Sequence, residues 1–187
     1  MKKFLPIFLC LSLSTVLTFA QQALPAVDRS PLDVSYYPQN YPVQKIQDKI
    51  TEPLKARVIY SRPQRANRTI FGGLVQYGEL WRLGANEATE LEFFKNAHIG
   101  GKKVSKGRYT LYAIVNEKSW TIIVNKETDT WGAFKYDQKK DVLRTTVNVQ
   151  RTDSTIESLV MTFEKTPTGC NLVIAWENTK VSLPMVF

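Results

Sequence analysis

The sequence has little of what metal and nucleotide sites are usually built from. Its 187 residues include one histidine and two cysteines, too few for a zinc site made of these ligands. It contains neither a Gly-x-Ser-x-Gly nucleophile elbow nor a glycine-rich loop that would cradle a phosphate. We therefore expect no metal site, no cofactor and no Ser-His-Asp triad, and we assign no catalytic residue from the sequence.

The composition is that of an ordinary globular protein. Hydrophobic residues make up 43% and charged residues 22%, values that fit neither a polytopic membrane protein nor a disordered acidic chain. Lysine and arginine outnumber aspartate and glutamate by 25 to 17, which gives a formal charge of +8. The basic residues are scattered, in pairs such as Lys102-Lys103 and Lys139-Lys140, so we attribute them to solubility and expect no nucleic-acid partner.

Residues 1–20 have the pattern of a secretory signal peptide. Two lysines precede an apolar run of about 16 residues, which is shorter than the ~20 that span a membrane. Small residues at Thr18 and Ala20 predict cleavage after Ala20, which would give a periplasmic or secreted protein without a transmembrane segment. Cleavage removes Cys10 and leaves Cys170 alone, so we expect no intramolecular disulfide and an inert, packed thiol.

Residues 21–53 are rich in proline and tyrosine. Proline fixes φ and lacks the amide proton, so this segment fits neither a regular helix nor a central strand. The three tyrosines are costly in a free linker, which predicts that the later half packs on the domain as an extended arm. The prolines are Pro25, Pro31, Pro38, Pro42 and Pro53, and the tyrosines are Tyr36, Tyr37 and Tyr41.

Residues 54–187 show repeated alternation of apolar and polar side chains, as in Ala56, Val58 and Tyr60 or Trp120, Ile122 and Val124. Short runs of turn-forming residues separate the alternating segments and leave no room for crossover helices. We therefore predict an all-β fold, a single antiparallel, jelly-roll-like β-sandwich of about eight to ten strands. The turns are expected at 100–101, 106–107, 116–118, 153–154 and 167–169, and Val181, Leu183 and Met185 are expected to form a strand after the one that ends near Trp176.

The segment 71–89 is the least strand-like part of this domain, and four glycines interrupt it. Aromatic, guanidinium, amide and carboxylate groups on a glycine-bent loop can form a polar pocket, in which arginine binds an anion bidentately and tryptophan stacks on a ring. The alternative is a structural loop in which the tryptophan fills one end of the sandwich and the polar groups bond the backbone. The candidate ligand-binding residues are Tyr77, Trp81, Arg82, Asn86, Glu87 and Thr89.

Other chemistry-bearing residues have simpler interpretations. His98 precedes a predicted turn and is expected in solvent. Glu90 and Glu92 alternate with Leu91 and Phe93, so the carboxylates are expected on the outer face of a strand rather than as an acid–base pair. A calcium site remains an alternative in one loop, although the spacing fits no EF-hand; its aspartates are Asp129, Asp137 and Asp141.

The stretch from Trp81 to Thr89, WRLGANEAT, resembles the core of the bacterial domain-of-unknown-function family numbered 2911. Leu83 stands where threonine is common in that family, which removes one possible hydroxyl ligand. The resemblance implies an exported β-rich domain and carries no established activity, and the segment around Tyr36-Tyr37-Pro38 resembles the leader of members from Bacteroidota. Further similar blocks extend it over roughly residues 54–187: residues 59–63, 70–72, 107–111, 120–123, 131–133 and 176–179.

The leading functional hypothesis is non-enzymatic binding of a small polar ligand, a glycan or an envelope partner by the loop that contains Arg82. One alternative is a hydrolase or lyase that uses Arg82 with Glu87. Another is a structural accessory of an envelope complex, with the tyrosine-rich arm as its docking element.

Overall fold

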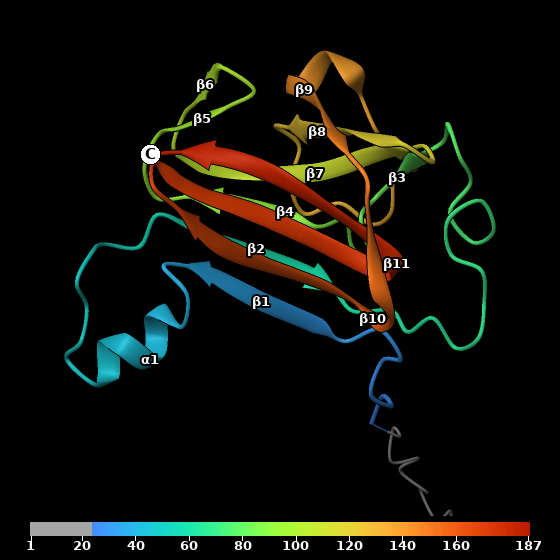
Figure 1. Ribbon diagram of the computed structural model, residues 1–187, viewed down its shortest axis with the longest axis horizontal. Helices are drawn as coiled ribbons and strands as arrows, with labels where there is room; N and C mark the ends of the chain where they lie inside the picture. The colour runs from blue at the N-terminus through green and yellow to red at the C-terminus, as the bar shows by residue number, and fades with distance from the viewer. Residues whose placement is uncertain (1–23) are drawn as a thin grey trace, which may run out of the picture.

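The structure, a computed structural model, describes residues 24–187 as two antiparallel β-sheets packed face to face (Figure 1). The predicted signal peptide and its cleavage point at Ala20 lie outside the described residues. The larger sheet runs in the order β1, β2, β4, β7, β8, β9, with β3 paired to β7. Its strands are β1 (Leu32–Tyr37), β2 (Ala56–Ser61), β3 (Leu80–Trp81), β4 (Glu90–Phe93), β7 (Gly107–Val115), β8 (Ser119–Asn125) and β9 (Asp141–Asn148).

The smaller sheet contains a long hairpin and a short one. Its order is β10 (Gln150–Thr166), β11 (Gly169–Val186), β5 (Ala97–Ile99) and β6 (Lys102–Val104). In Figure 1 the β10–β11 hairpin crosses in front of the larger sheet. The helices in residues 24–187 are one turn of α-helix, α1 (Tyr41–Ile46), and the 3-10 turn η1 (Gln138–Lys140), and neither approaches the length that crossing a bilayer requires.

The predicted all-β antiparallel sandwich is confirmed. The described residues contain eleven strands where about eight to ten were expected, and the excess consists of β3, β5 and β6, which have two or three residues each. The alternation also holds in detail. On β4, Leu91 and Phe93 are buried between the sheets, whereas Glu90 and Glu92 lie on the outer face beside arginines of the neighbouring strands.

Two details of the predicted strand pattern are wrong. Asp153-Ser154 is not a turn but lies inside β10, where the pairing with β11 shifts register between Arg151 and Ile156. β11 is one continuous strand rather than two. Glu177 has a φ of 55° within it, and this irregularity changes the phase of the buried side chains from even to odd residue numbers.

The later half of the predicted arm belongs to the sandwich. Its strand β1 forms the edge of the larger sheet and pairs with β2 along its whole length. Tyr37 is buried, its hydroxyl donates to the Gly169 carbonyl at 2.6 Å, and its ring stacks on Phe187 with centroids 5.6 Å apart. The proline-flanked segment therefore helps to close the interior between the sheets.

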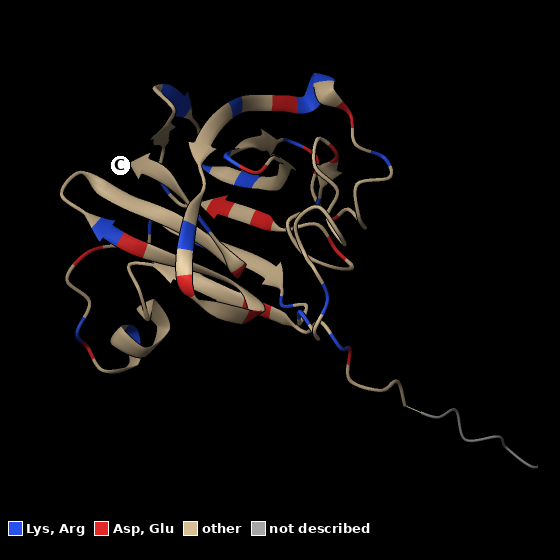
Figure 2. Ribbon diagram, turned by 45° about the vertical axis from the view of Figure 1, so that its right-hand side comes forward, with Lys and Arg blue, Asp and Glu red and all other residues tan. Residues whose placement is uncertain are grey.

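Charged side chains of both signs are interleaved over the strands and loops (Figure 2). On the outer face of the larger sheet, Arg57 pairs with Glu92 at 2.7 Å, and Arg108 pairs with Glu90 at 2.7 Å and with Asp129 at 2.6 Å. This mixed surface agrees with the scattered basic residues of the sequence.

Cys170 is fully buried, and burial raises the pKa of its thiol from the ordinary 9.0 to about 12. The unfolded chain therefore ionises this thiol at a lower pH than the folded protein does. The contribution of the protonated thiol to the free energy of unfolding is therefore fully present below pH 9, and it is lost as the pH rises towards 12. Replacing Cys170 by Ala should make the free energy of unfolding less sensitive to pH between 10 and 11, by about 1.4 kcal/mol per pH unit.

Urea unfolding of the wild type and of Cys170→Ala at pH 8, 9, 10 and 11 measures this difference. The tyrosines titrate in both proteins and cancel in the comparison, apart from Tyr37, whose pKa is raised first by burial and then by the nearby Cys170 thiolate; the variant Tyr37→Phe, with and without Cys170→Ala, removes this contribution. If the free energies of unfolding of the two proteins changed with pH in parallel above pH 9, the thiol would ionise as readily in the folded protein as in the unfolded chain, which would contradict the prediction.

Candidate functional site

The segment from Trp81 to Thr89 begins in the interior of the sandwich. β3 pairs with the C-terminal end of β7, at Ala113 and Ile114, and the Trp81 indole lies between the sheets, where the residue is 7% exposed. The indole stacks on Trp176 of the smaller sheet, with centroids 6.2 Å apart, and meets Trp120 of the larger sheet edge-on at 5.8 Å. Its Nε1 donates to the Gly84 carbonyl at 3.1 Å. Trp81 thus joins both sheets and also fixes the turn that follows it.

Hydrogen bonds to buried groups hold the turn after Trp81. The Thr89 hydroxyl is fully buried and donates to the Leu83 carbonyl at 2.7 Å, and the Ser61 hydroxyl lies 2.6 Å from both the amide nitrogen and the carbonyl of Ala85. A side chain at Gly84 would place its Cβ 2.6 Å from the Ser61 oxygen, so this close approach requires glycine. These polar groups satisfy the backbone of the turn.

The next part of the segment supports a second loop. The Ala88 amide donates to the Thr130 carbonyl at 3.0 Å, and the Gly132 amide donates to the Asn86 carbonyl at 2.9 Å. Asn86 has a φ of 57°, a left-handed conformation that asparagine tolerates better than most residues. The backbone of residues 86–88 therefore anchors residues 130–132.

Arg82 differs from its neighbours because a buried side-chain donor has no partner among residues 24–187. Its Nε is buried without a hydrogen-bond acceptor, and burial alone lowers the pKa of its guanidinium. Arg65 also has a buried Nε without a hydrogen bond, but Glu177 lies 3.6 Å from that atom. Among residues 24–187, Arg82 has no such acidic neighbour. Partial burial of a cation without a counter-charge is unfavourable, so Arg82 is the side chain of this segment that the fold itself does not explain.

Arg82 lines a pocket of about 220 Å³ at the end of the sandwich. The walls combine apolar side chains with two cations, and no acidic residue lines the pocket. Arg68, the second cation, already donates to the carbonyls of Gln64 and Arg65. The lining residues are Ser30, Pro63, Arg68, Leu74, Val75, Trp81, Arg82, Gly84, Ala85 and Trp176.

The structure does not bring the six predicted site residues together. Only Trp81 and Arg82 line the Arg82 pocket. Glu87 is exposed and lines a different pocket of about 170 Å³ that also includes Glu90 and Asp129. Asn86 and Thr89 lie in the turn. Tyr77 is 36% exposed, and its ring packs over Gly72, where an added Cβ would lie 2.8 Å from the ring.

The aspartates proposed as calcium ligands each bind a protein partner. Asp129 pairs with Arg108, the Asp137 carboxylate accepts from the Lys139 amide at 2.9 Å, and Asp141 accepts from the Tyr136 hydroxyl at 2.7 Å. No group of three or more histidine, cysteine, aspartate or glutamate side chains within residues 24–187 is arranged to hold a metal ion.

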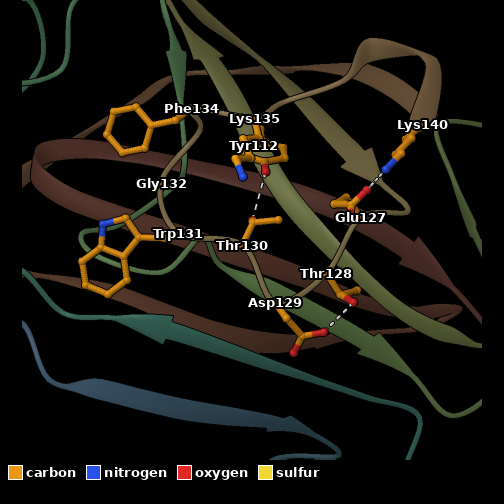
Figure 3. A pocket seen from close by; sticks show the side chains of 10 residues that line it. All are labelled: Tyr112, Glu127, Thr128, Asp129, Thr130, Trp131, Gly132, Phe134, Lys135 and Lys140. Atoms are coloured by element: carbon orange, nitrogen blue, oxygen red, sulfur yellow. Dashed lines mark hydrogen bonds and ion pairs between the residues drawn. The ribbon is translucent and has the colours of Figure 1, made fainter.

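A larger pocket, of about 510 Å³, lies outside the predicted segment (Figure 3). It forms where residues 127–135 cover the outer face of β7, whose Tyr112 is buried beneath them. Trp131 and Phe134 line this pocket and are 61% and 85% exposed. The sequence contains a signal for it, because Trp131, Phe134 and Tyr136 gather in a loop that shows no strand alternation.

The fold defines an antiparallel β-sandwich protein in which the WRLGANEAT segment packs against the interior, with pockets of about 220 and 510 Å³ beside it. The family model described as a protein of unknown function (DUF2911) matches residues 41–185. The chain therefore belongs to this family, as the WRLGANEAT segment predicted. No curated protein and no solved structure matches it.

The hydrogen bond from Thr89 to the Leu83 carbonyl leads to a prediction about stability. Thr89→Val keeps the shape of the side chain but leaves the buried Leu83 carbonyl without its donor, which should lower the free energy of unfolding by about 1–3 kcal/mol. Thr89→Ser retains the hydroxyl and should lose less. Chemical unfolding of both variants measures the difference, and equal losses would mean that the hydroxyl does not hold the turn.

Proposed function

We propose that this chain is an exported, non-enzymatic binding protein that holds a small ligand through a carboxylate or phosphate group on Arg82. The observation that carries the proposal is the buried Arg82 Nε, which has no hydrogen-bond partner among the described residues and belongs to the lining of a pocket. The signal-like residues 1–20 support the exported location.

The chemistry of the pocket favours an anion. A guanidinium presents several N–H donors in a planar fork that matches carboxylate and phosphate oxygens. Burial lowers the dielectric around Arg82 and strengthens its attraction for an opposite charge. Arg68 adds a second positive charge, and no acidic residue of the lining competes for either cation.

The walls and the size of the pocket define the rest of the ligand. Trp81, Trp176, Leu74 and Val75 present indole and aliphatic surface beside the cations. A volume of about 220 Å³ is below the roughly 300–1,000 Å³ of typical drug-sized sites. The ligand is therefore a small organic anion with an apolar part, or the anionic head of a larger molecule.

The geometry supports binding better than the two alternatives. A hydrolase or lyase would need Glu87 beside Arg82, and Glu87 lies in another pocket. The residues that line the Arg82 pocket include Ser30 but no histidine or carboxylate that would activate it as a nucleophile. The accessory hypothesis needs a free tyrosine-rich arm, whereas Tyr37 is buried in the sandwich and bonded to Gly169.

Thermal unfolding with three probes tests the proposal. Hexanoate supplies a carboxylate with an apolar tail, inorganic phosphate supplies the anion alone, and hexanamide is the uncharged match of hexanoate. A ligand at 100 times its Kd stabilises the folded state by about 2.7 kcal/mol, so binding should raise Tm measurably. We expect hexanoate or phosphate to raise Tm and hexanamide to have no effect.

Arg82→Gln should abolish the increase, whereas Arg151→Gln, which changes an exposed arginine on β10, should retain it. A larger response to phosphate than to hexanoate would identify phosphate-bearing ligands, and the reverse would identify carboxylates. Equal effects of all three probes, no effect of any, or an unchanged response in Arg82→Gln would each refute the proposal.

A further inference from the structure

We propose that the pocket beside Trp131 is a second binding site, and that it takes a neutral oligosaccharide. It shares no lining residue with the Arg82 pocket, so the two pockets are distinct. Its volume of about 510 Å³ is within the range of small-molecule sites. Figure 3 shows the rings of Trp131 and Phe134 on the same side of the loop, with Gly132 between them.

The backbone that carries the two aromatic side chains is held in place in the absence of a ligand. Hydrogen bonds from Ala88 to Thr130 and from Gly132 to Asn86 fix the backbone on either side of Trp131. Gly132 has a φ of 66°, and a Cβ there would lie 2.7 Å from the Phe134 ring, so this ring rests directly against the glycine. A rigid platform of this kind loses little conformational entropy when it binds.

The polar groups of the pocket balance one another in charge. Glu127 pairs with Lys140, the Thr128 hydroxyl donates to Asp129 at 2.7 Å, and the hydroxyls of Tyr112 and Thr130 lie 3.2 Å apart, as Figure 3 shows. The lining includes two acidic residues and two lysines, in contrast to the Arg82 pocket with its two cations. The charged residues of the pocket thus give no preference for an ionic ligand of either sign.

A sugar chain matches this combination of groups. The C–H face of a sugar ring is apolar and gains by covering an exposed indole or phenyl ring, while its hydroxyls both donate and accept hydrogen bonds. Two exposed rings on one loop offer platforms for more than one sugar unit, which is why we infer an oligosaccharide rather than a monosaccharide. The large exposed area of Trp131 and Phe134 is otherwise unfavourable for a monomer.

Tryptophan fluorescence provides a specific test, because Trp131 is exposed and the other three tryptophans are buried. The probes are neutral hexasaccharides of β-1,4-glucose, β-1,4-N-acetylglucosamine, α-1,4-glucose and α-1,6-mannose, titrated to millimolar concentration. We expect at least one to give a saturable change in emission. Trp131→Ala should abolish its binding in calorimetry, and Phe134→Ala should weaken it by ten-fold or more.

Phe94→Ala is the matched control, because Phe94 is a partly exposed aromatic residue outside this pocket. Arg82→Gln should also bind the sugar normally, so the result does not depend on the anion site. No saturable response to any hexasaccharide would overturn the inference. So would a dimer that Trp131→Ala converts to a monomer in sedimentation, because the platform would then be an interface between two copies of the chain.

Discussion

The packing of Trp81 between the two sheets is the contact on which the candidate site depends. Its indole touches Trp120 on one sheet and Trp176 on the other, and its Nε1 bonds the turn at Gly84. Aromatic pairs contribute about 0.5–1.5 kcal/mol each beyond the area they bury, so this cluster ties the sheets together and fixes the direction of the chain that leaves β3. The adjacent residue, Arg82, is held at the pocket for that reason.

One short motif therefore shapes two surfaces. Trp81 and Thr89 fasten the turn to the interior, and the backbone of Asn86 and Ala88 fastens the loop that presents Trp131. The side chains of Trp81 and Thr89 and the backbone of Asn86 and Ala88 bond the protein itself, which is the structural role that the sequence analysis gave as the alternative. Arg82 stands apart because its Nε is buried and lacks an acceptor among residues 24–187.

Much of the fold could be predicted from the sequence, because burial of one strand face imposes an alternation that is visible in the residues, as in β4 with Leu91 and Glu92. The continuity of β11 could not be predicted, since the irregularity at Glu177 reverses the alternation and resembles a break between strands. The sequence also did not predict that β1 forms the edge of the larger sheet. Proline excludes a central strand, but it is compatible both with an edge strand and with an extended arm that joins no sheet.

The candidate site was predictable only in part. The residue types of the WRLGANEAT segment pointed to Arg82, but which polar side chains remain free depends on partners distant in the sequence, such as Ser61 and Thr130. Trp131 and Phe134 were not identified as a site, because their exposure follows from how their loop crosses β7. The gathering of aromatic residues in a loop was visible in the sequence, but the path of that loop over β7, which leaves two of the rings exposed, was not.

The claim that Arg82 is held for a ligand rather than for the fold can be measured most directly in the stability of Arg82→Met. Methionine retains an unbranched apolar stem and removes a half-buried cation that has no counter-charge among residues 24–187, so the ligand-free protein should be as stable as the wild type or more stable. A loss of about 3–5 kcal/mol in chemical unfolding, the cost of breaking a buried ion pair, would show that the guanidinium has a partner within the protein and would contradict the account.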